Sequence, residues 1–167
     1  MSSFEIPPLE EDIDYLAVHE YDFAVATPNP DFDHLVTERV NICKAVAMYH
    51  QDTRQGLLAH LSSSLHITKS LDALTDAFER DMHEVDVSIM AAADSSNRWQ
   101  WPSLESICDH FMHTNPRSLR VDAGNGKPIR GFALDLKTGD IKEIGKPGMH
   151  LRRYHSQPEI LQPIPSG

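Results

Sequence analysis

The sequence predicts an α+β domain in which a long antiparallel pair of helices and a third helix pack on a small antiparallel sheet. Two patterns carry this prediction. Apolar residues recur at helical spacing through the middle of the chain, and the last third breaks into short β-like stretches separated by turn residues. Of the 167 residues, 40% are hydrophobic and 24% are charged, a balance that suits one globular domain with its own core.

Residues 68–93 carry the clearest helical pattern, and we expect the other elements to pack around them. Their apolar residues step by three and four, which places them on one side of a helix. Thr68 and Ser70 are suitable N-caps, because their side-chain oxygens can accept a hydrogen bond from the first turn. The stripe consists of Leu71, Leu74, Phe78, Met82, Val85 and Ile89.

A second long helix is predicted before this one, over residues 34–55, with Asp33 as its cap. Gly56 is a break, after which leucines continue the apolar face to residue 65. Three serines at 62–64 are the expected turn between the two helices, which makes them an antiparallel pair. The apolar stripe of this helix comprises Val36, Val40, Cys43 and Ala47.

A third, shorter helix is predicted over residues 103–113, with Ser103 as its cap. Residues 15–26 alternate aromatic and β-branched residues with others, and we expect a strand or two there. The C-terminal third is predicted to form a β-meander that shares one sheet with this early strand, because glycine-containing turns separate its stretches. The expected strands are 118–122, 129–136, 141–144 and 149–154, with turns at 124–126 and 137–140.

The chain is expected to divide into a flexible acidic arm (1–14), a single α+β domain (15–155) and a Pro-rich tail (156–167). No apolar run approaches the roughly 18 residues that a membrane span requires. The acidic start shows no basic region typical of a signal peptide. We therefore expect a cytoplasmic protein in which Cys43 and Cys108 remain reduced.

The charge distribution suggests a first function. The net charge is −10, ten acidic residues precede the first basic one at Arg39, and residues 117–153 hold nine basic residues against four acidic ones. The first hypothesis is a non-catalytic domain of the inhibitor, immunity or adaptor type, which binds a protein with a basic surface or forms homo-oligomers through its helical pair. The two tryptophans are expected to pack against the core, with an exposed aromatic pair that binds a partner as the alternative. The candidate binding residues are Glu10, Glu11, Asp12, Asp14, Trp99 and Trp101.

An alternative is a small enzyme, with or without a metal, that uses a cluster of histidine and cysteine. His110 and His113 fall three residues apart on the third predicted helix, where both can reach one zinc ion, and Cys108 lies beside them. Cys43 and His50 are further candidate ligands. No CxxC or HExxH motif supports the metal, and no GxSxG motif supports a serine nucleophile, whereas a Cys–His pair remains open. Apart from zinc, no cofactor is expected.

A second alternative is a nucleic-acid binder that uses the basic C-terminal meander. Phe132 and Tyr154 are too few aromatic residues for a base-stacking platform. The negative charge of the whole chain also opposes a polyanionic partner. The glycines at 124 and 126 are not followed by a predicted helix, so we expect a turn there and no phosphate cradle.

Overall fold

The computed structural model describes residues 2–62, 67–92, 104–124 and 126–165, and its strands form two sheets. The seven-stranded sheet has the order β1 (Ser2–Ser3), β8 (Ser118–Asp122), β7 (Val85–Ala91), β5 (Lys44–His50), β6 (Gln55–Leu61), β3 (Asp22–Ala26) and β12 (Leu161–Pro163). The five-stranded sheet has the order β10 (Ile141–Ile144), β9 (Arg130–Asp135), β4 (His34–Val40), β2 (Ile13–Ala17) and β11 (Leu151–His155).

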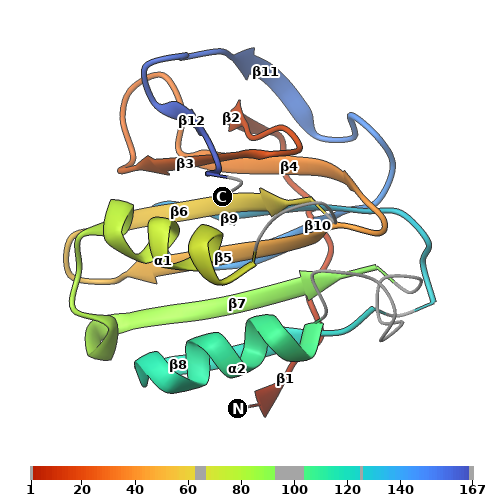
Figure 1. Ribbon diagram of the computed structural model, residues 1–167. Helices are drawn as coiled ribbons and strands as arrows, with labels where there is room; N and C mark the ends of the chain where they lie inside the picture. The colour runs from red at the N-terminus through yellow and green to blue at the C-terminus, as the bar shows by residue number, and fades with distance from the viewer. Residues whose placement is uncertain (1, 63–66, 93–103, 125, 166–167) are drawn as a thin grey trace.

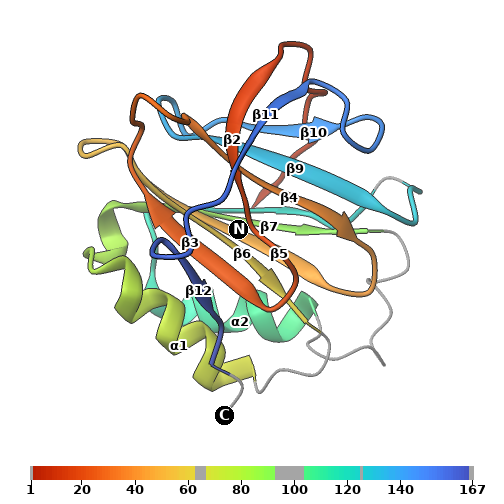
Figure 2. The same cartoon turned by 90° about the horizontal axis from the view of Figure 1, so that it is seen from above.

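Helices α1 (Ile67–Phe78) and α2 (Leu104–Thr114) cover one face of the seven-stranded sheet, and the five-stranded sheet covers the other (Figures 1 and 2). One core lies between the helices and the seven-stranded sheet and includes Phe78, Ile89 and Phe111. A second core lies between the two sheets and includes Leu35 and Leu58. Within the part of the chain that the structure describes, no helix is long and apolar enough to cross a membrane.

The predicted α+β fold with a long helical pair is wrong. Residues 34–55, expected to be a helix, contain β4 and β5, and residues 55–61 continue as β6. All seven residues of β5 are buried, because helices cover one face of this central strand and the second sheet covers the other. A strand buried on both faces has no polar alternation, so its continuous apolar run also fits a helical period.

The helix expected over residues 68–93 is only half present. Helix α1 ends at Phe78, and Glu79 has a φ of 57°, a left-handed conformation that terminates helices. A short 3₁₀ helix, η1 (Met82–Glu84), follows and leads into β7. Strand β7 contains Val85, Val87 and Ile89, whose β-branched side chains favour a strand that pairs with β5 and β8.

The later elements agree better with the sequence. Helix α2 and strands β8 to β11 lie within one or two residues of their predicted positions. The turn at 137–140 joins the antiparallel pair β9–β10, and Gly139 has the positive φ expected of it. Strands β8 and β9, however, belong to different sheets, so the connection that contains Gly124 crosses from one sheet to the other and is not a hairpin turn.

Described residues from both ends of the chain contact the sheets. Ile6 and Leu9 are buried, and the Leu9 amide donates to the Glu143 carbonyl at 2.7 Å. Near the other end, β12 pairs with β3, and Ile164 is buried. The division of the chain into an arm, a domain and a tail stays a prediction.

A buried ion cluster ties the two sheets together. The guanidinium of Arg130 in β9 donates to Asp122 in β8 at 2.8 Å and to Glu143 in β10 at 2.6 Å, and it also donates to the Ala91 carbonyl at 2.9 Å. Burial alone would raise the pKa of Asp122, but the hydrogen bonds from Arg130 and the Gly124 amide lower it. The cluster therefore keeps the Asp122 carboxylate ionised inside the fold.

Replacement of Arg130 by alanine should destabilise the fold by about 3–5 kcal/mol, because it leaves two buried carboxylates without their partner. Urea unfolding at pH 7 measures this loss. Lys127→Ala is the matched control, since Lys127 reaches the same Glu143 from a half-exposed position at 3.2 Å and should contribute only about 1 kcal/mol or less. Equal losses in the two variants would contradict a dominant role for Arg130.

Candidate active site

The pairing of β5 with β6 brings a cysteine and a histidine to one face of the seven-stranded sheet. Ala45 lies opposite His60 in this antiparallel pair, and Cys43 directly precedes β5. Continuing the side-chain alternation of β5 by one residue places Cys43 on the face of Ala45 and hence of His60. Diagonal neighbours of this kind lie roughly 7 Å apart. Ala45 belongs to the core between the sheets, so the imidazole faces the second sheet.

A hydrogen-bonded chain across the two sheets orients the His60 ring. The Thr37 hydroxyl in β4 lies 2.8 Å from the Val18 carbonyl and 2.8 Å from Nδ1 of His60. A carbonyl can only accept, so the single hydroxyl hydrogen goes to Val18. Towards His60, the Thr37 oxygen therefore accepts from an Nδ1–H group. This assignment leaves Nε2 of the neutral ring with a bare lone pair.

His60 is a buried, neutral imidazole with one bare ring nitrogen. Its side chain is only 2% exposed, and Nε2 has no hydrogen-bond partner among the described residues. Burial lowers the pKa of His60 to about 4, an effect that the nearby Glu20 carboxylate partly opposes. The imidazole is therefore neutral at physiological pH and can accept a proton at Nε2.

The Cys43 thiol is a buried group that lies beneath the turn between β2 and β3. Its Sγ atom donates to Oε1 of Glu20 at 3.3 Å, while Cys43 itself is 2% exposed. No disulfide joins it to Cys108. Glu20 thus links the two groups, because it bonds Cys43 and lines the same pocket as His60.

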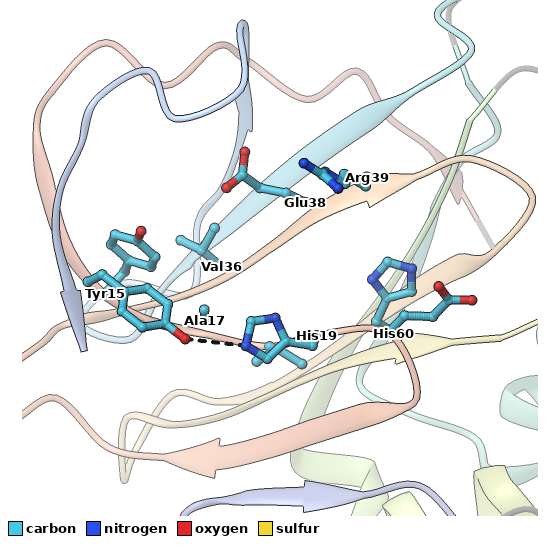
Figure 3. A pocket seen from close by; sticks show the side chains of 10 residues that line it. Tyr15, Ala17, His19, Val36, Glu38, Arg39 and His60 are labelled. Atoms are coloured by element: carbon cyan, nitrogen blue, oxygen red, sulfur yellow. Dashed lines mark hydrogen bonds between the residues drawn. The ribbon is translucent and has the colours of Figure 1, made fainter. Parts of the chain in front are cut away.

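A pocket of about 380 Å³ opens at this end. Figure 3 shows His60 and His19 along one side of it and Glu38 and Arg39 along another. His19 also bonds the Tyr154 hydroxyl at 3.3 Å, and Tyr154 packs edge-to-face on Tyr15. The remaining lining residues are Ala17, Val18, Glu20 and Val36, so the pocket combines an aromatic wall and small apolar side chains with charged groups near His60.

The backbone beside the pocket departs from regular structure at two places. The register of β4 against β9 shifts between Thr37 and Val40, and Arg39 within this bulge has a φ of 60°. Tyr21, in the turn above Cys43, has a φ of 73°. Bulges and left-handed residues other than glycine are concentrated at functional sites, where they aim side chains that a regular strand would misplace.

The three side chains have the roles required for nucleophilic catalysis. Cys43 supplies a thiol, His60 a basic nitrogen on the same face, and Thr37 holds the other ring nitrogen. Sequence analysis placed Cys43 on an apolar helical stripe and among the candidate metal ligands, left a Cys–His pair open without naming its residues, and did not single out Thr37, His60 or Glu20. The turn-forming residues 51–54 contained the missing signal, because a hairpin there places His60 across from Ala45.

The main predicted metal ligands, His110 and His113, lie elsewhere, on α2. Nε2 of His110 is 3.7 Å from Asp72, whereas Nδ1 of His113 bonds the Asp109 carbonyl at 2.6 Å. Within the described residues, no group of three or more histidine, cysteine or carboxylate side chains is arranged to hold a metal ion. A zinc site at His110 and His113 stays a prediction. Neighbouring Cys108 is buried, and burial raises the pKa of its thiol.

The acidic binding candidates meet basic residues of the same chain. Asp12 pairs with His150 at 3.1 Å and with Arg152 at 3.8 Å, and Asp14 pairs with Arg153 at 3.7 Å. Together with Glu10 and Glu11 they line a second pocket of about 390 Å³. The acidic and basic ends of the chain therefore contact each other. Trp99 and Trp101 lie outside the described residues.

Buried neutral His60 should make stability depend on pH. Below pH 6.5 the unfolded chain protonates this residue, whereas the folded chain does so only near pH 4. The free energy of unfolding should therefore fall as the pH drops through this window. Between pH 7.5 and 5, wild type should lose about 2 kcal/mol more than His60→Gln in urea unfolding. An equal loss of unfolding free energy in wild type and His60→Gln would show that His60 is not buried as a neutral ring.

Comparison with known proteins gives superpositions on solved structures over part of the chain. No family model matches the sequence, and no curated protein matches it significantly. The Bacillus licheniformis hypothetical protein YfiH superimposes with a TM-score of 0.44 and 14% identity, over 63% of this chain and 51% of that one. Neisseria meningitidis protein NMB0706, which carries the family name DUF152, superimposes with a TM-score of 0.47 and 8% identity, over 70% of this chain and 65% of that one. Both scores lie below 0.5, so the candidate site rests on the residues of this chain alone.

Proposed function

We propose that this chain is an acyl-transfer enzyme, a hydrolase of amides, esters or thioesters, with Cys43 as its nucleophile. His60 acts as general base and Thr37 orients it. One observation carries the proposal: Nε2 of His60 is buried, has no hydrogen-bond partner among the described residues and lies on the face that carries the Cys43 thiol. A buried polar atom without a partner is costly, and such atoms are retained where function needs them.

The proposed reaction has two steps. Sγ of Cys43 attacks the acyl carbon while its proton passes to Nε2 of His60, and the leaving group departs with that proton as a thioester forms. Nε2 then takes a proton from water, whose oxygen attacks the thioester and releases the carboxylic acid and the thiol. Thr37 accepts from Nδ1–H throughout, so the ring presents Nε2 in both steps and the imidazolium keeps a hydrogen-bond acceptor.

The pocket suits an acyl compound with an apolar or aromatic portion. Ala17 and Val36 offer small apolar surfaces, and the rings of Tyr15 and Tyr154 stand edge to face beside them. The end near His60 is polar. A substrate can therefore place its apolar part along β2 and β4 and its carbonyl near the thiol.

This proposal develops the enzyme alternative of the sequence, with Cys43 and His60 in place of the helix histidines. The hypothesis of a non-catalytic acidic binding domain has less support. Asp12 and Asp14, which it assigns to a basic partner, already pair with basic residues of this chain. A protein partner, a homo-oligomer and a cytoplasmic location stay predictions.

An activated ester tests the proposal directly. p-Nitrophenyl acetate should release p-nitrophenol in a burst, and peptide mass spectrometry should place one acetyl group on Cys43. Cys43→Ala should abolish both. His60→Gln should slow acylation about 10²–10⁴-fold, the usual contribution of a general base. Thr37→Val should slow it less, because the ring loses its orienting acceptor but keeps Nε2.

Cys108→Ala provides the control, since Cys108 is a buried thiol whose pKa is raised and which has no role in the proposal. Its burst should match wild type. Circular dichroism checks that each variant folds. Acetylation that persists at the wild-type rate in Cys43→Ala, or His60→Gln with an undiminished burst, would overturn the proposed function.

A further inference from the structure

Glu20 is a carboxylate held over the proposed nucleophile by a turn that both neighbouring strands anchor. The turn joins β2 to β3, with the Asp22 amide donating to the His19 carbonyl at 3.0 Å. The Tyr21 amide donates to the carbonyl of His60 itself at 3.1 Å, and the Tyr21 carbonyl accepts from the Ile164 amide at 2.7 Å. The left-handed backbone of Tyr21 completes the turn. The position of Glu20 relative to His60 is therefore built into the fold.

The Glu20 side chain separates the thiol from solvent. Glu20 is exposed, whereas Cys43 beneath it is buried, and the two are joined by the 3.3 Å hydrogen bond from Sγ to Oε1. In this arrangement the thiol hydrogen points at a carboxylate and not at Nε2 of His60. Glu20 also lines the pocket, so a substrate that approaches Cys43 through this opening meets it first.

We propose that Glu20 is a positioning residue that holds Cys43 in a resting state. Its carboxylate keeps the thiol hydrogen away from His60, and its negative charge opposes formation of the thiolate. Entry of an acyl substrate displaces the carboxylate, and the thiol then turns to Nε2. This inference rests on the proposed function, because it assigns a role to Glu20 at the same site.

Other charged and titratable groups lie in the pocket that Glu20 lines, and they come from several elements. His19 shares the turn with Glu20, His60 comes from β6, and Glu38 and Arg39 come from β4. The Tyr154 hydroxyl from β11 bonds His19. The neighbouring Lys44 is fully buried, donates to the Ile42 carbonyl at 3.1 Å, and is the residue next to Cys43 in the chain. Of the carboxylates that line this pocket, Glu20 is the one bonded to the thiol, and Glu38 accepts instead from the Gly148 amide at 3.2 Å.

The test measures alkylation of Cys43 in a Cys108→Ala background, where it is the single cysteine of the chain. Rates with neutral iodoacetamide are followed by intact mass from pH 5 to 10. Glu20→Gln should react about tenfold faster at pH 7, and its pH midpoint should move to lower pH. The rate with anionic iodoacetate should rise more than that with iodoacetamide, because a local negative charge is gone. A purely structural role of Glu20 would not change the ratio of the iodoacetate rate to the iodoacetamide rate.

Glu38→Gln is the matched control, since it removes a carboxylate from the same pocket without touching the thiol, and its iodoacetamide rate and pH midpoint should match the background. Glu20→Ala, which removes the cover as well as the charge, should react at least as fast as Glu20→Gln. The inference would be overturned if both Glu20 variants kept the alkylation rates of the background and its ratio of iodoacetate rate to iodoacetamide rate. Because alkylation needs no acyl substrate, failure of the ester assay would remove the proposed function and leave this result intact.

Discussion

The antiparallel register between β5 and β6 is the constraint on which the fold and the site both depend. Every residue of β5 is buried, so its two faces must match two different cores. Val46 and Met48 face the helices, while Ala45 and Ala47 face the second sheet. A shift of one residue would exchange the two sets and place large side chains where the sheets approach each other. The same register carries Cys43 and His60 to the face between the sheets.

Burial then gives the site its chemical character. The hydrogen bond between Thr37 and His60 joins strands of different sheets, so the packing of one sheet on the other also fixes the ring. Low solvent access keeps the imidazole neutral, and the hydroxyl of Thr37 decides which nitrogen carries the proton. A neutral thiol beside a neutral base avoids the cost of a buried ion pair until a substrate arrives.

The sequence correctly predicts elements that have one polar and one apolar side. It misleads for β4 and β5, whose side chains are buried on both faces of the strand. Helix α2 and strand β8 have polar and apolar sides, which reveal their period, whereas turn residues mark the end of the almost wholly buried β9. The apolar run of β4 and β5 lacks this contrast, so a helical stripe through Val36 and Ala47 looked plausible. The histidines on α2 suggested a metal site because they are close in sequence. The residues of the candidate site come from four separate segments. The pairing of β5 with β6 brings Cys43 towards His60, and the packing of one sheet on the other brings Thr37 to His60.

The tautomer of His60 tests the account most directly. A long-range ¹H–¹⁵N correlation spectrum of the full chain distinguishes protonated from bare ring nitrogens, and the spectrum of His60→Gln assigns the signals of this residue among the ten histidines. We expect a neutral ring at pH 7 with the proton on Nδ1 and a bare Nε2, unchanged down to about pH 5. A proton on Nε2 at pH 7, in a neutral or a charged ring, would contradict the role of His60 as the base for Cys43.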